Sequence, residues 1–142
     1  MQRALVTGAG KRLGRAMALY LAGRGFDVAV HYATSQAEAG KTAAEITAKG
    51  RKAALLQADL LKEVETELLL PRAAAVLGGP ITCLVNNASI FEADDIQTAT
   101  RESWERHIGS NLRAPFVLTQ AMAGHPGGSS GWRKRRWNTP SR

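Results

Sequence analysis

A glycine-rich turn between an apolar run and an amphipathic stretch constrains the fold of this chain more than any other feature. The turn covers residues 7–16, Thr-Gly-Ala-Gly-Lys-Arg-Leu-Gly-Arg-Ala. The run before it, residues 3–6, suits a parallel strand that is buried on both faces. After it, apolar residues recur at spacings of three and four, as on one face of a helix: Leu13, Met17, Tyr20 and Leu21. The pattern predicts a strand, a tight turn and a helix.

Such a turn is suited to binding an anion. Its glycines leave no side chain between the helix N-terminus and a bound group, and the free N–H groups and the dipole of the helix favour negative charge. The turn therefore predicts a site for the pyrophosphate of a dinucleotide. Its spacing, Gly8-x-Gly10-x-x-x-Gly14, differs from the usual Gly-x-Gly-x-x-Gly, and it lacks the Lys and hydroxyl residue of a P-loop. A glycine-rich loop without a ligand is the alternative.

Short strands and helices alternate over the rest of residues 1–123. Strand patterns follow at 26–32, 52–57 and 81–85, and helical patterns at 35–50, at 62–77 with an interruption or restart at Pro71, and at 100–122 with a bend at Gly109 or Pro115. The alternation predicts an α/β fold, a doubly wound, Rossmann-like parallel sheet in a three-layer α/β/α arrangement, ending after about four strands. The first strand is expected between the second and the fourth. All four loops that follow the strands then open on one edge of the sheet, where ligands bind.

Residues 124–142 break this alternation and carry an excess of positive charge. They hold five of the 19 basic and none of the 12 acidic residues, so residues 1–123 account for only +2 of the net charge of +7. We predict a disordered basic tail, and we favour a truncated or frame-shifted reading frame as its origin because it begins in the middle of the fold. The alternative is a nucleic-acid-binding tail in which Trp132 and Trp137 stack on bases.

The end of the second strand indicates which dinucleotide would bind. Sites for NAD place an Asp or Glu there to accept from the ribose hydroxyls. Here the strand ends His31-Tyr32-Ala33-Thr34-Ser35, and Asp27 and Glu38 stand at the wrong positions. Arg12 would lie at the mouth of the neighbouring turn, and a cation without a carboxylate favours a ribose phosphate. We therefore expect NADP(H) in preference to NAD(H). A hydrogen-bonded histidine at a strand end is the alternative for His31.

These stretches resemble the short-chain dehydrogenase/reductase family, and within it the pteridine reductases. The turn is similar to the family's Thr-Gly-x-x-x-Gly-x-Gly, with Arg12 in place of the middle glycine, and residues 86–91, Asn-Asn-Ala-Ser-Ile-Phe, resemble the loop of the pteridine reductases. Residues 31–35 match their His-Tyr-x-x-Ser stretch, with Thr34 in place of an arginine. The resemblance covers residues 1–123 and only the N-terminal half of a typical member.

The resemblance implies roles for particular residues. Asp59 would accept from the adenine amino group, unless it only forms a turn. Phe91 would stack on a flat heteroaromatic substrate, or else plug the core beneath its loop. Asn111 would be the structural member of the catalytic tetrad, or else a solvated helix position. The expected cofactor-binding residues are Thr7, Gly8, Gly10, Lys11, Arg12, Leu13, Gly14, His31, Tyr32, Ser35, Asp59, Leu60, Asn87, Ala88 and Ser89.

The family's proton donor is missing from the sequence. Members reduce a carbonyl or imine with hydride from the nicotinamide, while the tyrosine of a Tyr-x-x-x-Lys motif donates the proton. Neither Tyr20 nor Tyr32 has a lysine four residues later, and both precede Asn111. We therefore expect this chain alone to bind NADPH at most, and a complete relative to act on a pterin-like small molecule. The alternatives are a non-catalytic nucleotide-sensing or interaction module and a nucleic-acid binder.

Composition excludes several other classes. The single cysteine, Cys83, excludes a disulfide framework and a multi-cysteine metal site, and no metal is expected. Neither a membrane span nor a signal peptide is evident, so we expect a cytoplasmic protein. A sheet that ends at the fourth strand has an open edge, and the last helix would expose an apolar face formed by Ile108, Leu112, Phe116 and Leu118. Self-association is therefore expected.

Overall fold

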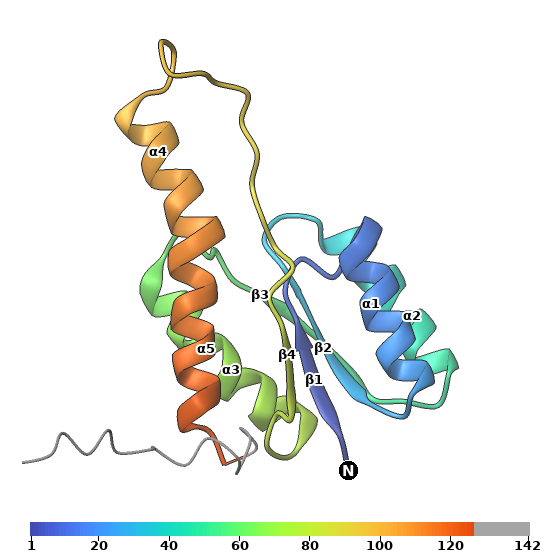
Figure 1. Cartoon of the computed structure of the whole chain (residues 1–142). Helices are drawn as coiled ribbons and strands as arrows, with labels where there is room; N and C mark the ends of the chain where they lie inside the picture. The colour runs from blue at the N-terminus through green and yellow to red at the C-terminus, as the bar shows by residue number, and fades with distance from the viewer. Residues whose placement is uncertain (127–142) are drawn as a thin grey trace, which may run out of the picture.

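The structure is a computed structural model that describes residues 1–126. Four parallel strands form the centre of the molecule (Figure 1). The strands are β1 (Arg3–Val6), β2 (Asp27–Tyr32), β3 (Ala53–Gln57) and β4 (Cys83–Val85). The helices are α1 (Arg12–Gly23), α2 (Gln36–Ala48), α3 (Glu63–Leu77), α4 (Arg101–Ile108), the π-helix η1 (Gly109–Arg113) and α5 (Ala114–Gly124). The strand order, β3-β2-β1-β4, confirms the predicted doubly wound sheet, with β1 between β2 and β4.

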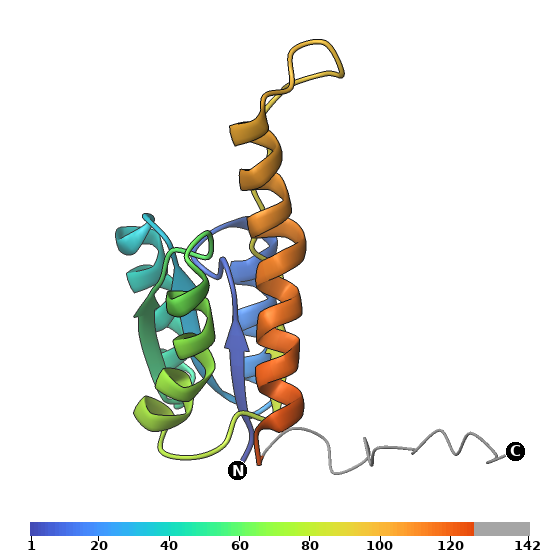
Figure 2. The same ribbon diagram turned by 90° about the vertical axis from the view of Figure 1, so that its left-hand side faces the viewer.

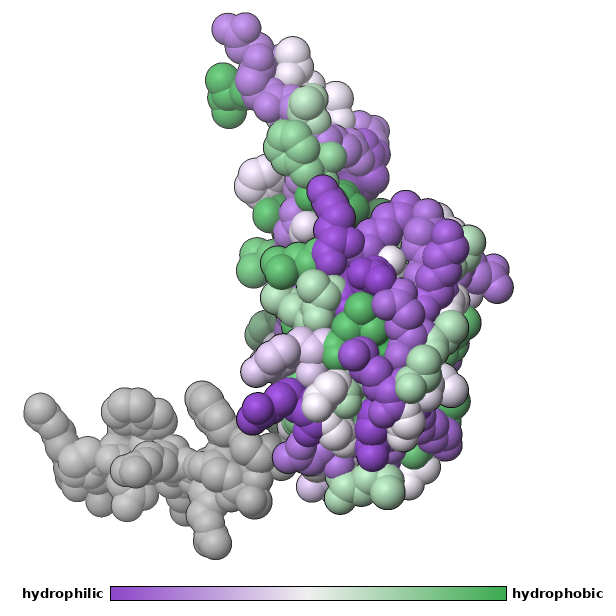
Figure 3. Space-filling view, turned by 90° about the vertical axis from the view of Figure 1, so that its right-hand side faces the viewer, coloured by the Kyte–Doolittle hydropathy of each residue, from purple (hydrophilic) through white to green (hydrophobic). Residues whose placement is uncertain are grey.

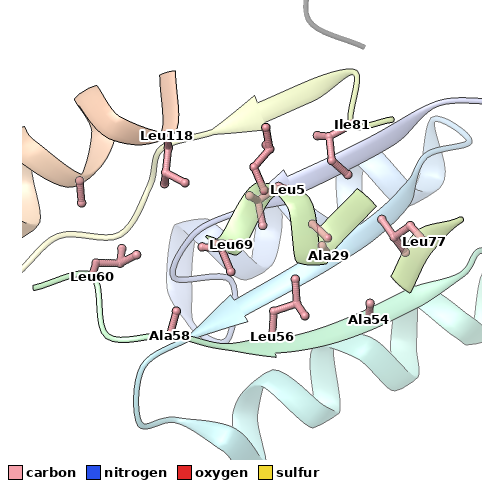
Figure 4. Packing of buried hydrophobic residues seen from close by; sticks show 13 residues of the cluster. Leu5, Ala29, Ala54, Leu56, Ala58, Leu60, Leu69, Leu77, Ile81 and Leu118 are labelled. Atoms are coloured by element: carbon pink, nitrogen blue, oxygen red, sulfur yellow. The ribbon is translucent and has the colours of Figure 1, made fainter. Parts of the chain in front are cut away.

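Two helical layers enclose the sheet, with α1 and α2 on one face and α3 with the α4–η1–α5 rod on the other (Figures 1 and 2). Neighbouring residues along a strand face opposite layers. Leu5 and Ala29 belong to the core under α3 and α5, where Leu69 and Leu118 pack (Figure 4). Val6, Val28 and Val30 belong to the core under α1 and α2, together with Ala18, Ala39 and Ile46.

The apolar stripe that the sequence shows on α1 is not the face that the helix buries. Gly14, Ala18 and Ala22 are the buried residues of this helix, whereas Leu13 and Tyr20 are 61% and 67% exposed. The small side chains let the helix axis approach the sheet closely, which the larger apolar residues would prevent. Met17 and Leu21 are half-buried beside β4.

The expected interruption or restart of a helix at Pro71 is wrong. The helix α3 runs through Pro71 without interruption. Proline removes one N–H from the helix, but Pro71 and Glu67, whose carbonyl loses that donor, are both exposed, so water can satisfy the carbonyl. The rod over residues 101–124 is continuous, with a π-turn that begins at Gly109 and Pro115 in the first turn of α5, where its missing N–H costs little.

The far side of β4 is open among the described residues, because β4 pairs with β1 alone. Leu112 and Phe116 are 62% and 60% exposed and Ile108 is half-buried, but Leu118 is buried in the core, so the predicted exposed face is wrong for Leu118. Gly124 still belongs to α5, and His125 accepts a hydrogen bond from the Ile81 N–H (3.0 Å). The predictions for the basic tail, including Trp132 and Trp137, fall on residues beyond 126 and lie outside the described part.

Candidate functional site

A cavity of about 740 Å³ lies at the carboxyl edge of the sheet. The loops after all four strands and Ser110 of η1 line it, as the doubly wound topology predicts. Every residue that we expected to bind the cofactor lines this cavity except Thr7. The fold thus brings together four segments that are far apart in the sequence.

Glycine is required at two positions of the turn. A side chain at Gly14 would collide with the carbonyl oxygen of Gly8 and with Nδ2 of Asn87. Gly8 itself has a φ of +64°, a conformation that residues with a Cβ rarely adopt. These contacts bring the first turn of α1 close to the end of β1. The turn therefore presents backbone, and little side chain, to the cavity.

The N-terminus of α1 offers unpaired N–H groups at the cavity. Those of Arg12, Leu13 and Gly14 precede the first helical hydrogen bond, which runs from the Arg15 N–H to the Lys11 carbonyl (3.2 Å), and no acceptor within residues 1–126 bonds them. Two amides earlier in the turn are not free. The Gly8 N–H donates to Nδ1 of His31 (3.1 Å) and the Ala9 N–H to the His31 carbonyl (2.9 Å). An anion can therefore bind the helical amides but not these two.

Arg12 adopts the backbone conformation of the glycine that it replaces in the family motif. Its φ is +46°, in the left-handed region, which costs an L-residue about 1–2 kcal/mol. Its side chain is exposed, lines the cavity and forms no ion pair with the acids of residues 1–126, whereas the neighbouring Lys11 pairs with Glu38 (3.3 Å). A guanidinium without a partner, held at the mouth of the cavity, is suited to a phosphate.

Thr7 acts behind the cavity wall. It is buried, and its hydroxyl accepts from the N–H groups of Asn87 and Ala88 (3.0 Å each) and donates to the Val85 carbonyl (3.3 Å). The Asn87 side chain returns hydrogen bonds to the carbonyls of Thr7 (2.9 Å) and Gly8 (3.2 Å). The expected direct contact of Thr7 is therefore corrected: this residue fastens the loop after β4 to the glycine turn.

The segment after β2 lines the cavity without a carboxylate. Tyr32 and Ser35 lie there as expected, and Ala33 and Thr34 join them. Asp27 lies at the other end of β2, where it pairs with Arg51 (2.7 Å). His31 is 1% exposed, lines the cavity and bonds through both ring nitrogens, which confirms the alternative of a hydrogen-bonded histidine at a strand end; its contact with a cofactor stays a prediction.

Asp59 is both a turn former and part of the cavity wall. Its Oδ1 accepts from the Leu61 N–H (3.0 Å), while its own N–H donates to Oε2 of Glu65 (2.6 Å). That backbone donor, followed by Lys62, lowers the pKa of Glu65. Ser35 stands at the N-cap of α2, but its hydroxyl makes no capping bond, which leaves it available to a ligand.

The loop after β4 runs past the cavity into an arm that projects with α4 beyond the body, with hydrophobic residues exposed along it (Figures 1 and 3). Asn111, in η1, accepts from the Ile90 N–H and donates to the Ile90 carbonyl (2.9 Å each), so it holds this loop in place. Ser89 lines the cavity as expected. Phe91 is 87% exposed outside the cavity lining, so its alternative as a core plug is wrong.

Leu61, Ile90 and Ser110 line the cavity although no pattern in the sequence pointed to them. Ser110 precedes Asn111 in the π-turn, a geometry that no spacing rule predicts. Burial raises the pKa of the Cys83 thiol, which keeps it protonated. Within residues 1–126, no group of three or more His, Cys, Asp or Glu side chains could hold a metal ion, and no helix is long and apolar enough to cross a membrane.

Comparison with known proteins gives consistent matches. The family described as short chain dehydrogenase matches residues 2–131. An uncharacterized oxidoreductase of Methylorubrum extorquens is 39% identical over 124 residues, covering 87% of this chain and 50% of that protein. The 3-oxoacyl-(acyl-carrier-protein) reductase FabG of Staphylococcus epidermidis is 36% identical over 119 residues, covering 84% of this chain and 48% of the enzyme. The chain spans about half the length of the curated relatives it matches.

Two solved structures extend the comparison. A short chain dehydrogenase from Burkholderia cenocepacia in complex with NADP superposes with a TM-score of 0.84 at 40% identity, over 87% of this chain and 50% of that one. The FolM alternative dihydrofolate reductase 1 from Brucella suis, also with NADP, superposes with a TM-score of 0.81 at 36% identity, again over 87% and 50%. Both neighbours hold the same dinucleotide.

Proposed function

The chain belongs to the short-chain dehydrogenase/reductase family, and from this premise we propose that it is the NADP(H)-binding portion of a reductase. One observation carries the proposal: the loops after all four strands line a cavity at the N-terminus of α1, where neither the amides of residues 12–14 nor the Arg12 guanidinium has a partner within residues 1–126. The neighbours that hold NADP support it.

Each part of the cofactor has a suitable partner in the cavity wall. The pyrophosphate would accept from the N–H groups of residues 12–14. The ribose phosphate would bind the Arg12 guanidinium. The hydroxyl of Ser35, three residues after the end of β2, lines the same cavity and would donate to this phosphate. Oδ2 of Asp59, which bonds no group of residues 1–126, would accept from the adenine amino group. Among residues 1–126, Asp59 is the only acid in the cavity lining, so no carboxylate at the end of β2 competes for or repels a ribose phosphate.

The reaction that this cofactor supplies is hydride transfer to a carbonyl or imine. The proton has to come from elsewhere, because Tyr20 lies on the outside of α1 and Tyr32, although it lines the cavity, has no lysine four residues later. We propose that the residues of this chain bind and orient the cofactor, while Asn111 positions the loop beside the nicotinamide through Ile90.

A pterin-like compound is the substrate class that we propose for the whole enzyme. The Asn-Asn-Ala-Ser-Ile-Phe loop resembles that of pteridine reductases, and one structural neighbour is an alternative dihydrofolate reductase. Dihydrofolate contains a pterin ring. Phe91 is exposed on the same loop, which leaves its ring free to stack on a flat heterocycle.

Titration of NADPH and NADH by fluorescence tests the cofactor proposal. We expect NADPH to bind at least about tenfold more tightly than NADH, a difference of about 1.4 kcal/mol. Arg12→Ala should remove most of this difference by weakening NADPH alone. Arg15→Ala is the matched control, because Arg15 lies on the same helix and pairs with Glu45 (2.6 Å) outside the cavity lining.

The alternatives make different predictions in the same experiment. Binding of NADPH without reduction of a substrate agrees equally with a non-catalytic nucleotide-sensing module, so this result does not separate that module from the cofactor-binding portion of an enzyme. Failure of both dinucleotides to bind, with salt-dependent binding of DNA, would replace the proposal with a nucleic-acid binder.

A further inference from the structure

His31 bonds both of its ring nitrogens to backbone at the edge of the cavity. Nδ1 accepts from the Gly8 N–H (3.1 Å) in the loop after β1, and Nε2 lies 3.0 Å from the Ala58 carbonyl at the end of β3. An N–H group can only donate and a carbonyl can only accept. Nδ1 must therefore be unprotonated and Nε2 must carry the hydrogen. The arrangement selects one tautomer of the neutral imidazole.

The histidine holds the glycine turn at two consecutive amides. Its ring binds the Gly8 N–H and its carbonyl binds the Ala9 N–H (2.9 Å). The Gly8 carbonyl in turn lies against Gly14 and accepts from Asn87 (3.2 Å). A shift of the Gly8 peptide would therefore move the first turn of α1, which carries the unpaired amides.

The other ring nitrogen reaches the opposite wall of the cavity. Ala58 immediately precedes Asp59, whose carboxylate lines the cavity. Because β2 lies between β1 and β3, the side chain of one residue at its end joins the loops of both neighbours. One imidazole thus adds a side-chain link between the loops after β1 and β3, beside the backbone bonds Ala9 N–H to the His31 carbonyl (2.9 Å) and Ala58 N–H to the Tyr32 carbonyl (3.2 Å).

We propose that neutral His31 is a positioning residue for the cofactor, and that uptake of one proton by its Nδ1 opens the glycine turn and releases the dinucleotide. A protonated Nδ1 would point an N–H at the Gly8 N–H, so the acceptor is lost and two donors face each other. The effect on binding rests on the proposed function, whereas the effect on the turn does not.

The surroundings of His31 set the pH range of this change. Burial is the largest cause, and it lowers the pKa of His31. The hydrogen bond to the Ala58 carbonyl raises this pKa, and the positive charge of Arg72 on α3, which donates to the Gln57 carbonyl (2.9 Å), lowers it. The remaining charged residues of the cavity wall are Lys11, Arg12 and Asp59. The pKa of His31 in the folded protein lies below the value of about 6.5 for an unperturbed histidine. The site is therefore intact at pH 7, and it opens as the pH falls through the folded pKa.

Binding is measured with the full chain by titrating both NADH and NADPH from pH 7.5 to 5. NADH is included because the ribose phosphate of NADPH titrates near pH 6. We expect the affinity of the wild type for both dinucleotides to fall by up to tenfold for each pH unit below the folded pKa of His31. His31→Gln, which cannot take up a proton, should bind less tightly at pH 7 and lose this pH dependence. His107→Gln is the control, because His107 also accepts a backbone N–H, from Glu92 (3.0 Å), but lies outside the cavity lining.

A measurement without cofactor separates the two proposals. Long-range ¹H–¹⁵N correlation of the wild type should show His31 with a hydrogen on Nε2 alone at pH 7, and protection of the Gly8 amide from exchange should fall together with its protonation. Wild type that shows these signals but binds neither dinucleotide would refute the proposed function and leave the role of His31 in the turn intact. A hydrogen on Nδ1 at pH 7, or equal pH dependence in wild type and His31→Gln, would overturn the inference.

Discussion

At the cavity, polar side chains bond the backbone of neighbouring loops, whereas on the outside of α1 and of the α4–η1–α5 rod large apolar side chains stay exposed. Thr7, His31 and Asn111 each make at least two hydrogen bonds to main chain from another segment. On the outside, Tyr20, Leu112 and Phe116 are all more than half exposed, and a separate apolar hollow beside β4 is lined by Ala16, Met17, Tyr20, Leu21 and Val85.

This difference separates two kinds of requirement. Hydrogen bonds among residues 1–126 join the loops that line the cavity. The exposed apolar surfaces have the character of places where another surface packs. Substitutions at the cavity should therefore change ligand binding and stability, while substitutions on the outside should change association without changing binding.

The largest effect is expected at Gly14. Gly14→Ala would place a Cβ against the Gly8 carbonyl and Asn87, so the turn must move. We expect a loss of about 3 kcal/mol in the free energy of unfolding, and a loss of NADPH binding of at least about 100-fold. Denaturant unfolding and fluorescence titration measure the two. Gly23→Ala is the control, because a Cβ added at this end of the same helix would meet no atom within 4 Å. Equal behaviour of both variants would contradict the close approach.

A smaller loss is expected at Thr7. Thr7→Val keeps the shape of the side chain but leaves the N–H groups of Asn87 and Ala88 without their acceptor. We expect destabilisation by about 2 kcal/mol and weaker binding of NADPH, because the loop after β4 is released. Thr47→Val is the matched control, since the Thr47 hydroxyl is exposed and donates only within α2, to the Ala43 carbonyl (3.0 Å). Urea denaturation measures the free energy of unfolding of both variants. A Thr7 variant as stable as the control would refute the role of the hydroxyl.

At Arg12, stability and selectivity should change in opposite directions. Arg12→Gly relieves the left-handed φ of +46°, so the net gain in the free energy of unfolding should be about 1 kcal/mol. The same variant loses the guanidinium, so its preference for NADPH over NADH should disappear. Arg12→Ala separates the two effects, because it keeps the strain and loses only the preference. A destabilised Arg12→Gly would show that the side chain, and not the backbone, limits stability at this position.

The smallest change in stability is expected on the outside of the rod. We expect the chain to self-associate through this surface, and the double variant Leu112→Ser/Phe116→Ser to sediment as a smaller species. The free energy of unfolding of this variant should change by only about 0.5 kcal/mol, and its affinity for NADPH should stay the same. Val64→Ser, at an exposed apolar residue of α3, is the control. Unchanged sedimentation of the double variant would exclude this surface from the association.

The sequence was sufficient for the sheet and most of the cavity wall. The glycine turn between a buried strand and a helix demands one local geometry, and alternation of strands and helices then fixes the edge at which the loops meet. The buried face of α1 was not predictable in the same way, because hydrophobic periodicity favours the larger residues Leu13 and Tyr20, whereas a close approach to the sheet selects Gly14 and Ala18. Periodicity carries no information on the distance between helix and sheet.

Contacts between segments that are far apart in the sequence were also not predictable from it. The two bonds of His31 require β1 and β3 at known distances on either side of β2, and the sequence supplies only their order. The π-turn that presents Ser110 and Asn111 holds one extra residue in a turn of the rod, and no spacing in the sequence marks it. Pro71 predicts a break in α3 because a proline removes one N–H donor from a helix. In the packed fold this position is exposed, so water replaces the lost donor, and the sequence does not reveal that exposure.

The central claim is that the unpaired amides of residues 12–14 bind the phosphates of NADP(H) at the cavity. The most direct test is a ¹H–¹⁵N correlation spectrum of the full chain during titration with NADPH. The account predicts saturable shifts of the Arg12, Leu13 and Gly14 amide signals at one common dissociation constant, with the Gly23 amide unmoved. Saturable binding of NADPH that leaves the signals of residues 12–14 in place would contradict it.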